Sequence, residues 1–388
     1  MRVSLPFVAA AVLVTTGCDD GSSLPSSTHA ALETYADIAE ASYADAHARA
    51  EALDAALASL VAAPSEATMT AARSAWLAAR DPYLQTEALR FSEGPIDDAE
   101  LGVEGQLNAW PLNESHVDYV GSLAFTGLVN HPEIPLTRES LLAENENPGE
   151  RDVTVGYHAI EFLLWGVDDD ANGPGRRSHA DYLVGAGATA ANGDRRGQYL
   201  GLVSDLLVDD LATLVGAWDA SRTDGYRTAF LGSIGDRDAL RRAFQGLYVF
   251  TLREIGGDRL SALLSHDQED EHSCFSDNTK RDFVMDLLGV QNLYRGHYAR
   301  VDGSTIDGTG LRDVLAEVDA ELAATLDARI AESLALAEAM HDPFDREIAA
   351  DNAEGLARVE ALRASLATQS DLLLRAMRRL GLSPVASE

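Results

Sequence analysis

Helical periodicity runs through almost the whole chain, and this feature limits the fold to helices packed on helices. Ala, Leu and Tyr recur at helical spacing over residues 28–60 and again over residues 66–91. Residues 195–218 carry leucine and valine at helical intervals, with acidic residues on the opposite side. Alternating β-branched runs bounded by tight turns, which strands would need, are almost absent. The sequence therefore predicts an all-α fold.

Long helices with short connections are typical of up-and-down bundles. The chain has 388 residues, enough for more than one domain of ordinary size. A boundary within the stretch ASRTDGYRTAFLGSIGDRD divides the pattern into two halves. We therefore predict two up-and-down helical bundles, an N-terminal one over residues 29–220 and a C-terminal one over residues 221–388. Arg378 and Arg379 followed by Gly381 predict where the last helix ends.

The N-terminus predicts export and a lipid anchor. Arg2 is followed by an apolar stretch that is too short to span a membrane as a folded helix. Small residues then lead directly to Cys18, so residues 1–18 are interpreted as a lipoprotein signal peptide with a lipidated cysteine. Residues 19–28 would form a flexible linker. We expect a periplasm-facing lipoprotein of the bacterial cell envelope, with plain secretion as the alternative.

The charge of the chain restricts its partners. It contains 63 acidic and 30 basic residues, a formal net charge of −33. Such a negative field argues against binding to nucleic acid and to anionic lipid surfaces, and it favours cations as ligands. The only cysteine besides Cys18 is Cys274, so a disulfide framework is not expected.

One histidine and one glutamate interrupt the otherwise apolar segment GYHAIEFLLWG. His158 and Glu161 are three residues apart, so they share one face of a helix. Burying them is costly unless they have partners. A neutral imidazole and a carboxylate at this spacing can bind a divalent metal, and a hydrogen bond within the core is the alternative. The chain has no H-E-x-x-H motif, which argues against a zincin peptidase.

Two further acids are candidate ligands of the same metal. Glu87 lies on a helix face with Tyr83 and Leu84, where a solvated charge is not expected. Asp97 follows in the next loop, and its alternative role is to cap a helix or turn.

A second group of potential ligands lies in the stretch SHDQEDEHSCFSDNT. His266, Glu269 and His272 are spaced so that they could form a secondary metal cluster. The alternative is an exposed acidic loop that caps the next helix.

The segment DDDANG begins like a calcium-binding loop at Asp168. His179 occupies the position at which an EF-hand needs a bidentate glutamate, which argues against such a site.

The chain resembles the imelysin-like family over roughly residues 30–385. The family signature G-x-H-x-x-E is present as Gly156, His158 and Glu161, and the block AWLAARDPYLQTEALRFSEGPID is similar as well. The resemblance implies an all-helical, two-bundle fold and an exported envelope protein. It also implies a metal-related site around His158 and Glu161, with Glu87 from the preceding segment.

The family takes its name from a peptidase activity, whereas other members resemble components of iron uptake. A hydrolytic zinc site needs about three protein ligands, an open position for water and a general base. Glu161 cannot easily serve as both ligand and base, and carboxylates with one histidine suit iron better. We predict a metal-binding, iron-associated lipoprotein acting in iron acquisition or homeostasis, with Fe favoured over Zn and with an envelope transport or redox protein as partner. A metal-dependent peptidase and a helical adaptor without a metal are the alternatives.

Overall fold

The computed structural model describes residues 23–263 and 271–385, and it confirms the all-α prediction. Residues 1–18, the predicted signal peptide with Cys18, lie outside the described residues, as do His266 and Glu269 of the second cluster. No helix within the described ranges has the length and apolar character needed to cross a membrane.

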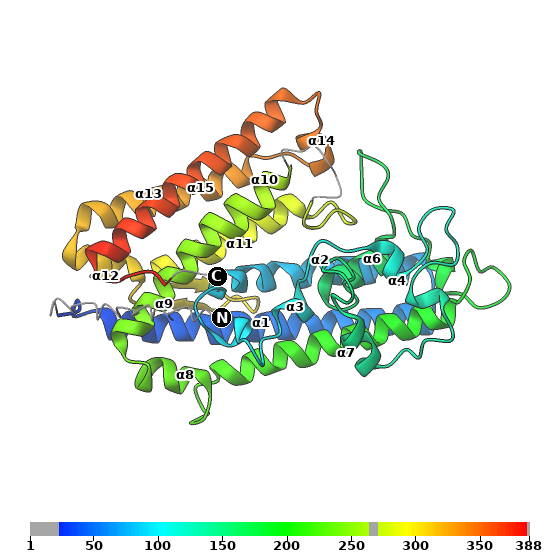
Figure 1. The fold of residues 1–388 in the computed structure, drawn as a ribbon, viewed down its shortest axis with the longest axis horizontal. Helices are drawn as coiled ribbons and strands as arrows, with labels where there is room; N and C mark the ends of the chain where they lie inside the picture. The colour runs from blue at the N-terminus through cyan, green and yellow to red at the C-terminus, as the bar shows by residue number, and fades with distance from the viewer. Residues whose placement is uncertain (1–22, 264–270, 386–388) are drawn as a thin grey trace, which may run out of the picture.

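Three long helices form the N-terminal part of the fold. They are α1 (Thr28–Ala62), α2 (Glu66–Thr86) and α7 (Gly193–Trp218), close to the ranges predicted from periodicity. α1 packs against both α2 and α7, as the lower half of Figure 1 shows. The short helix α6 (Gly156–Trp165) lies against α2 and α7, and all ten of its residues are buried. Its apolar surroundings explain why the segment is hydrophobic on every side.

The C-terminal part is a second set of packed helices, in the upper half of Figure 1. Its main members are α9 (Asp236–Val249), η6 (Phe250–Arg259), α11 (Thr279–Arg295), α13 (Ala320–Glu338) and α15 (Ala353–Arg379). α13 packs against α15 and α11, and α15 also contacts η6 and α9. α11 contacts α2, and α9 contacts α1, so the two helix sets share an interface. The boundary at residue 220 stays a prediction.

The last helix ends where the sequence predicts. α15 has Arg378 and Arg379 in its last turn, and Gly381 follows with a φ of 67°. A left-handed residue just past a helix is a common way to satisfy its last carbonyl groups.

Short helices fill the connections. They are α3 (Glu104–Leu107), α4 (Glu114–Val117), α5 (Arg138–Glu144), α8 (Tyr226–Thr228), α10 (Leu260–Leu263), α12 (Leu311–Val318), α14 (Phe344–Ile348), η1 (Glu87–Leu89), η2 (Pro95–Asp97), η3 (Leu128–Asn130), η4 (His179–Tyr182) and η5 (Ala229–Ser233). Binding and catalytic residues often lie on such irregular segments between rigid helices.

One short antiparallel hairpin was not predicted. β1 (His297–Ala299) pairs with β2 (Thr305–Asp307), and Tyr298 lies opposite Ile306. The connecting turn contains Gly303 with a φ of 87°, and the preceding residue is Asp302. An Asp-Gly pair is a recognised hairpin signal, but strands of three residues are too short to show an alternating pattern.

Candidate metal centre

Helix α6 carries the two central residues, and its first residue must be glycine. Gly156 has a φ of 83°, and a Cβ atom there would lie 2.5 Å from the carbonyl oxygen of Leu107. Neither the backbone conformation nor the space accepts a side chain. The close approach fixes the start of α6 against the end of α3, and this sets the positions of the residues one turn later.

His158 and Glu161 form a buried pair, as their spacing predicts. His158 Nδ1 lies 2.8 Å from Glu161 Oε2, and both side chains are fully buried. The other carboxylate oxygen, Oε1, accepts hydrogen bonds from the backbone N–H of Ser276 at 3.0 Å and from its hydroxyl at 2.6 Å. These two donors hold the carboxylate in the orientation that brings Oε2 to the imidazole.

Burial controls the protonation of this pair. It lowers the pKa of His158 well below its usual value, helped by the nearby His272 and Arg80, so the imidazole is neutral. Burial also raises the pKa of Glu161 to about 8, although the hydrogen bonds from Ser276 oppose this shift. When Glu161 is ionised, it accepts the Nδ1 proton of His158, and the lone pair is then on Nε2. His158 Nε2 has no hydrogen-bond partner among the described residues.

A second imidazole lies against the first. The ring centroids of His158 and His272 are 4.8 Å apart, although the two residues are far apart in the sequence. His272 Nδ1 lies 2.8 Å from Asp282 Oδ2, and its Nε2 lies 3.4 Å from the side-chain amide of Asn108. Burial lowers the pKa of His272 to about 4, with the charge of Arg259 adding to the effect. The centre therefore contains two neutral imidazoles at neutral pH.

Arg80 and Asp282 form a fully buried ion pair beneath the two histidines. Arg80 Nη2 lies 2.8 Å from Asp282 Oδ2, and Arg80 Nη1 donates to Asn108 Oδ1 at 2.6 Å. Burial alone would raise the pKa of Asp282, but Arg80 and the hydrogen bonds from His272 and Ser273 hold it well below its usual range. Asp282 thus stays ionised and fixes the orientation of His272.

Within the described residues, Glu87 makes its hydrogen bonds with residues other than His158 and Glu161. Its carboxylate accepts hydrogen bonds from Arg259 at 2.6 Å and from the Tyr83 hydroxyl at 2.9 Å. Burial would raise its pKa, but Arg90 and Arg259 outweigh burial and hold the pKa of Glu87 at about 2. The Asn108 amide lies 3.3 Å from Glu87 Oε2 and also approaches His272, so among the described residues it links Glu87 to the centre.

Asp97 also lies away from the His158–Glu161 pair. Its Oδ2 accepts a hydrogen bond from the backbone N–H of Phe91 at 2.6 Å, and its Oδ1 lies 3.3 Å from Arg90 Nε. Burial raises the pKa of Asp97, and Arg90 opposes the shift. In this arrangement Asp97 satisfies the backbone of the turn that follows η1.

A cavity of about 420 Å³ reaches His272. His272 and Trp110 contribute to its wall, and the ring centroid of each lies 4.8 Å from that of His158. His158 itself is not part of the wall. Acids outnumber bases around the cavity, which is lined by Arg90, Glu104, Asn108, Ala109, Trp110, Pro111, Glu146, Glu150, Glu254, Asp258, Arg259 and His272.

The donor set around His158 suits a transition metal but is not arranged as a closed site. Imidazole nitrogen and carboxylate oxygen are ligands for iron, zinc and related ions. Within the described residues, three donor atoms of His, Cys, Asp or Glu come within 4.8 Å of one another only at Asp168, Asp277 and Asp345, which form a separate group. His158 Nε2 is buried and has no hydrogen-bond partner among the described residues, so it is available as a ligand for a cation.

Sequence reasoning missed several residues that shape the centre, among them Arg80, Arg259 and Ser276. Arg80 could have been found, because it follows Trp76 at helical spacing on the buried face of α2. A charge on an apolar face indicates a buried partner. Ser276 and Arg259 carry no comparable local signal.

Comparisons with known proteins agree with the fold and with the resemblance to the imelysin-like family. The family model described as imelysin matches residues 39–373. Iron-regulated protein A of Synechococcus elongatus is 28% identical over 346 residues, which cover 86% of this chain and 81% of the relative. A crystal structure of a putative iron-regulated protein A precursor from Parabacteroides distasonis aligns with a TM-score of 0.71 and 18% identity, covering 92% of this chain and 97% of that one. An imelysin-like protein from Psychrobacter arcticum aligns with a TM-score of 0.65 and 16% identity, covering 94% and all of that chain (100%).

Proposed function

This chain belongs to the imelysin family, and from that premise we propose that it is a non-catalytic, iron-associated metal-binding protein of the bacterial cell envelope. The observation that carries the proposal is the buried Nε2 atom of His158. It has no partner among the described residues, and the ring of His158 contacts those of His272 and Trp110, which line an acid-rich cavity. A buried acceptor without a partner is costly, and a bound cation would satisfy it.

Each residue of the centre has a role in this proposal. A bound cation would favour ionised Glu161, which then accepts a hydrogen bond from Nδ1–H of His158 and leaves the lone pair of Nε2 for the metal, a common arrangement of carboxylate, histidine and metal. His272 supplies a second nitrogen donor, and Asp282 orients it. Glu87 and Asp97, which the sequence predicted as ligands, support the centre in this proposal. Glu87 pairs with Arg259, and Asp97 accepts a hydrogen bond from the backbone of a turn.

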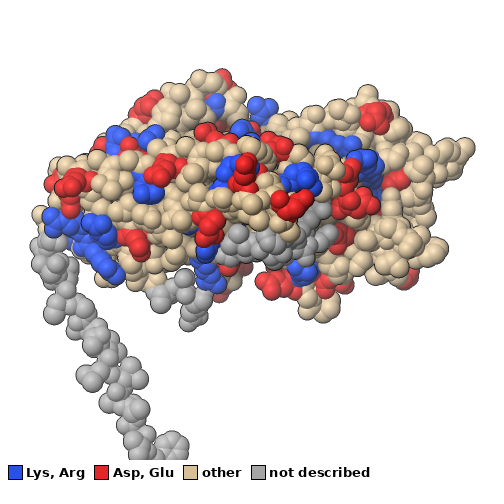
Figure 2. Space-filling view, turned by 90° about the horizontal axis from the view of Figure 1, so that it is seen from above, with Lys and Arg blue, Asp and Glu red and all other residues tan. Residues whose placement is uncertain are grey.

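The cavity provides a local negative potential that favours the entry of cations. On the face seen in Figure 2, acidic and basic side chains are interspersed rather than gathered in one patch. The net charge of −33 therefore acts as a general field, and the acids of the cavity act locally. Burial raises the pKa of Glu104 in this wall to about 7, as expected for an acid crowded by other carboxylates.

The same geometry disfavours peptide hydrolysis. A catalytic zinc needs about three protein ligands and an open position that a peptide can reach. His158 and Glu161 are fully buried and lie behind His272 and Trp110, so a peptide in the cavity would not contact them. Glu161 already bonds to His158 and Ser276, which leaves it unsuited to act as a general base.

Metal titration of the chain from Asp19 onward tests this function. We expect the parent to bind about one equivalent of Fe(II) in a chelator-free, anaerobic titration, and we expect folded His158→Ala to lose it. Glu161→Gln should weaken binding roughly 10–100-fold, the usual effect of removing the group that orients a ligand. The matched control is His297→Ala, which removes a half-exposed histidine paired with Asp307 in the β-hairpin.

Unchanged iron binding in folded His158→Ala would refute the assignment of the centre. Chelator-sensitive proteolysis that is lost in the same variant would instead support the peptidase alternative. Equal, negligible metal in parent and variant would support the adaptor alternative, in which the pair is a hydrogen bond of the core.

We also propose that Cys18 is lipidated and that the chain faces the periplasm, where a transport or redox protein would receive the metal. After expression in a Gram-negative host, the parent should partition with membranes, and Cys18→Ser should move to the soluble fraction. Cys274→Ser, which changes a buried cysteine of the folded domain, is the control and should stay with membranes. A soluble parent would argue for plain secretion.

A further inference from the structure

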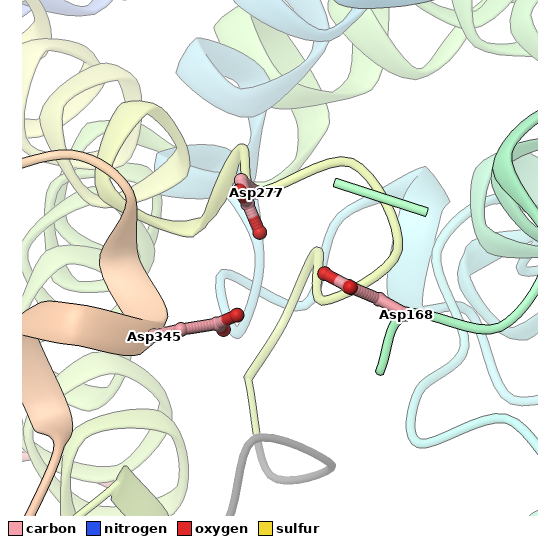
Figure 3. Close-up of side chains that lie close together, drawn as sticks. All are labelled: Asp168, Asp277 and Asp345. Atoms are coloured by element: carbon pink, nitrogen blue, oxygen red, sulfur yellow. The ribbon is translucent and has the colours of Figure 1, made fainter. Parts of the chain in front are cut away.

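Three aspartates from distant segments converge at a second place. Asp168 follows the end of α6, Asp277 precedes α11, and Asp345 lies in α14. One carboxylate oxygen from each lies within 4.8 Å of the others. Figure 3 shows the three carboxylate groups pointing toward one another. The arrangement is separate from the His158 centre and contains no imidazole.

Apart from one another, these carboxylates have almost no hydrogen-bond donors among the described residues. Asp345 is 4% exposed, and neither of its oxygens accepts a hydrogen bond there; the same holds for both oxygens of Asp277. Asp168 is 7% exposed, and only its Oδ1 has a donor, the backbone N–H of Asp170 at 3.0 Å. A buried carboxylate without a partner is strongly unfavourable, so this cluster requires positive charge or protons.

A fourth acid adjoins the group. Glu271 is fully buried, and its carboxylate interacts with that of Asp345. Burial and the neighbouring charge of Asp345 raise the pKa of Asp168 to about 7. Like charges gathered at this density are typical of a site that a cation neutralises.

The nearby basic side chains do not neutralise the cluster. Arg176 pairs with Asp170, and Lys280 pairs with Asp342 at 3.0 Å. No ion pair links a lysine or arginine of the described residues to the three aspartates or to Glu271. The compensating charge must therefore come from outside the chain or from bound protons.

We propose that Asp168, Asp277 and Asp345, with Glu271 beside them, form a calcium-binding site. Calcium takes six to eight oxygen ligands in a flexible geometry, and carboxylates that bind through one or both oxygens supply them. The absence of nitrogen and sulfur from this donor set disfavours zinc and iron. Magnesium demands near-ideal octahedral geometry and keeps several waters, which a cluster of buried carboxylates from three segments does not favour.

Calcium at this place would join three parts of the fold. It would tie the loop after α6 to α14 and to residues 271–278. The last segment also carries His272 and Ser276, which contact the His158–Glu161 pair. The ion would thus hold in place the segment that completes the His158 centre, although the proposal itself does not depend on metal binding at His158.

Calorimetric titration of the intact protein with CaCl₂, after EDTA treatment and removal of the chelator, tests the site. We expect one saturable site with a dissociation constant at or below about 1 mM, the weak end for protein calcium sites. Calcium should also raise the melting temperature. Asp277→Asn/Asp345→Asn should abolish both effects, and the control Asp351→Asn/Asp371→Asn, which removes two exposed charges, should retain them.

The direction of the stability change distinguishes a calcium site from a cluster of carboxylates that binds no ion. In metal-free buffer Asp277→Asn/Asp345→Asn should raise the melting temperature, because it removes repulsion between unpaired carboxylates. The same variant should be less stable than the parent when calcium is saturating. No saturable calcium binding by the parent, or an unchanged calcium response in the folded variant, would overturn the proposal.

Discussion

Replacing Arg259 with methionine is expected to lower the free energy of unfolding by about 3–5 kcal/mol, the usual cost of breaking a buried ion pair from one side. The guanidinium of Arg259 lies 2.6 Å from Glu87 and 2.7 Å from Asp286, and both carboxylates belong to fully buried residues. The variant would leave Asp286 without its ion-pair partner and Glu87 with Arg90 alone, in the core between α2 and α11.

The matched control for this variant is Arg253→Met in the same segment, η6. The Arg253 side chain is 53% exposed and lies 4.0 Å from Asp258. A surface pair of this kind contributes at most about 1 kcal/mol. Denaturant unfolding at neutral pH measures both variants, and an equal loss in the two would show that the Arg259 cluster adds nothing special to stability.

The effect of Arg259→Met should also depend on pH. In the parent, Arg90 and Arg259 hold the pKa of Glu87 at about 2, below its ordinary value of 4.5. This stabilisation is present above pH 4.5 and is lost as the pH falls toward 2. In the variant, the two carboxylates are buried with less positive charge, so they take up protons at higher pH and the variant recovers. The difference between parent and variant should therefore shrink from pH 7 to pH 4.

Local sequence patterns predicted most of the fold. The periodicity of apolar residues located α1, α2 and α7 within a few residues, because each helix buries one continuous face. The π-helical conformation of η6 was not predicted, since its sequence FTLREIGGDR differs little from that of an ordinary α-helix. The hairpin was missed because strands of three residues cannot show a period of two.

The centre could be predicted only where its contacts are local. His158 and Glu161 meet because a helix brings residues three apart onto one face. Ser276 binds Glu161 across 115 residues, and Arg259 binds Glu87 across 172 residues. A single sequence contains no signal for such pairings. The signature therefore located the pair, but whether Glu87 is a ligand or a support depends on a partner that only the fold reveals.

The convergence of Asp168, Asp277 and Asp345 illustrates the same limit. Sequence alone argued against calcium at Asp168, because the local loop lacks the glutamate of an EF-hand. The fold supplies acids from two other segments instead, and Asp170, a local candidate, pairs with Arg176. A motif tests only sites whose ligands are close in the sequence.

Gly156→Ala is expected to destabilise the protein more than a glycine substitution at a similar backbone angle in open space. The left-handed conformation costs an alanine roughly 1–3 kcal/mol. The new Cβ would also lie 2.5 Å from Leu107 O and 2.7 Å from Gln106 O, which are backbone atoms that cannot move alone. This overlap should add about 1–3 kcal/mol, as overpacking in a core does.

Gly235→Ala provides the matched control, because Gly235 has a φ of 82° and no atom within 4 Å of the added Cβ. It isolates the conformational cost, so the excess of Gly156→Ala over Gly235→Ala in denaturant unfolding measures the overlap with residues 106–107. Because Gly156 begins the helix that carries His158, relief of the overlap would displace α6 and separate His158 from His272 or Glu161 from Ser276. Gly156→Ala should then weaken iron binding as well as stability, whereas Gly235→Ala should change stability alone. Equal losses of stability, with iron binding unchanged in both, would mean that the glycine of the signature serves only its own backbone conformation.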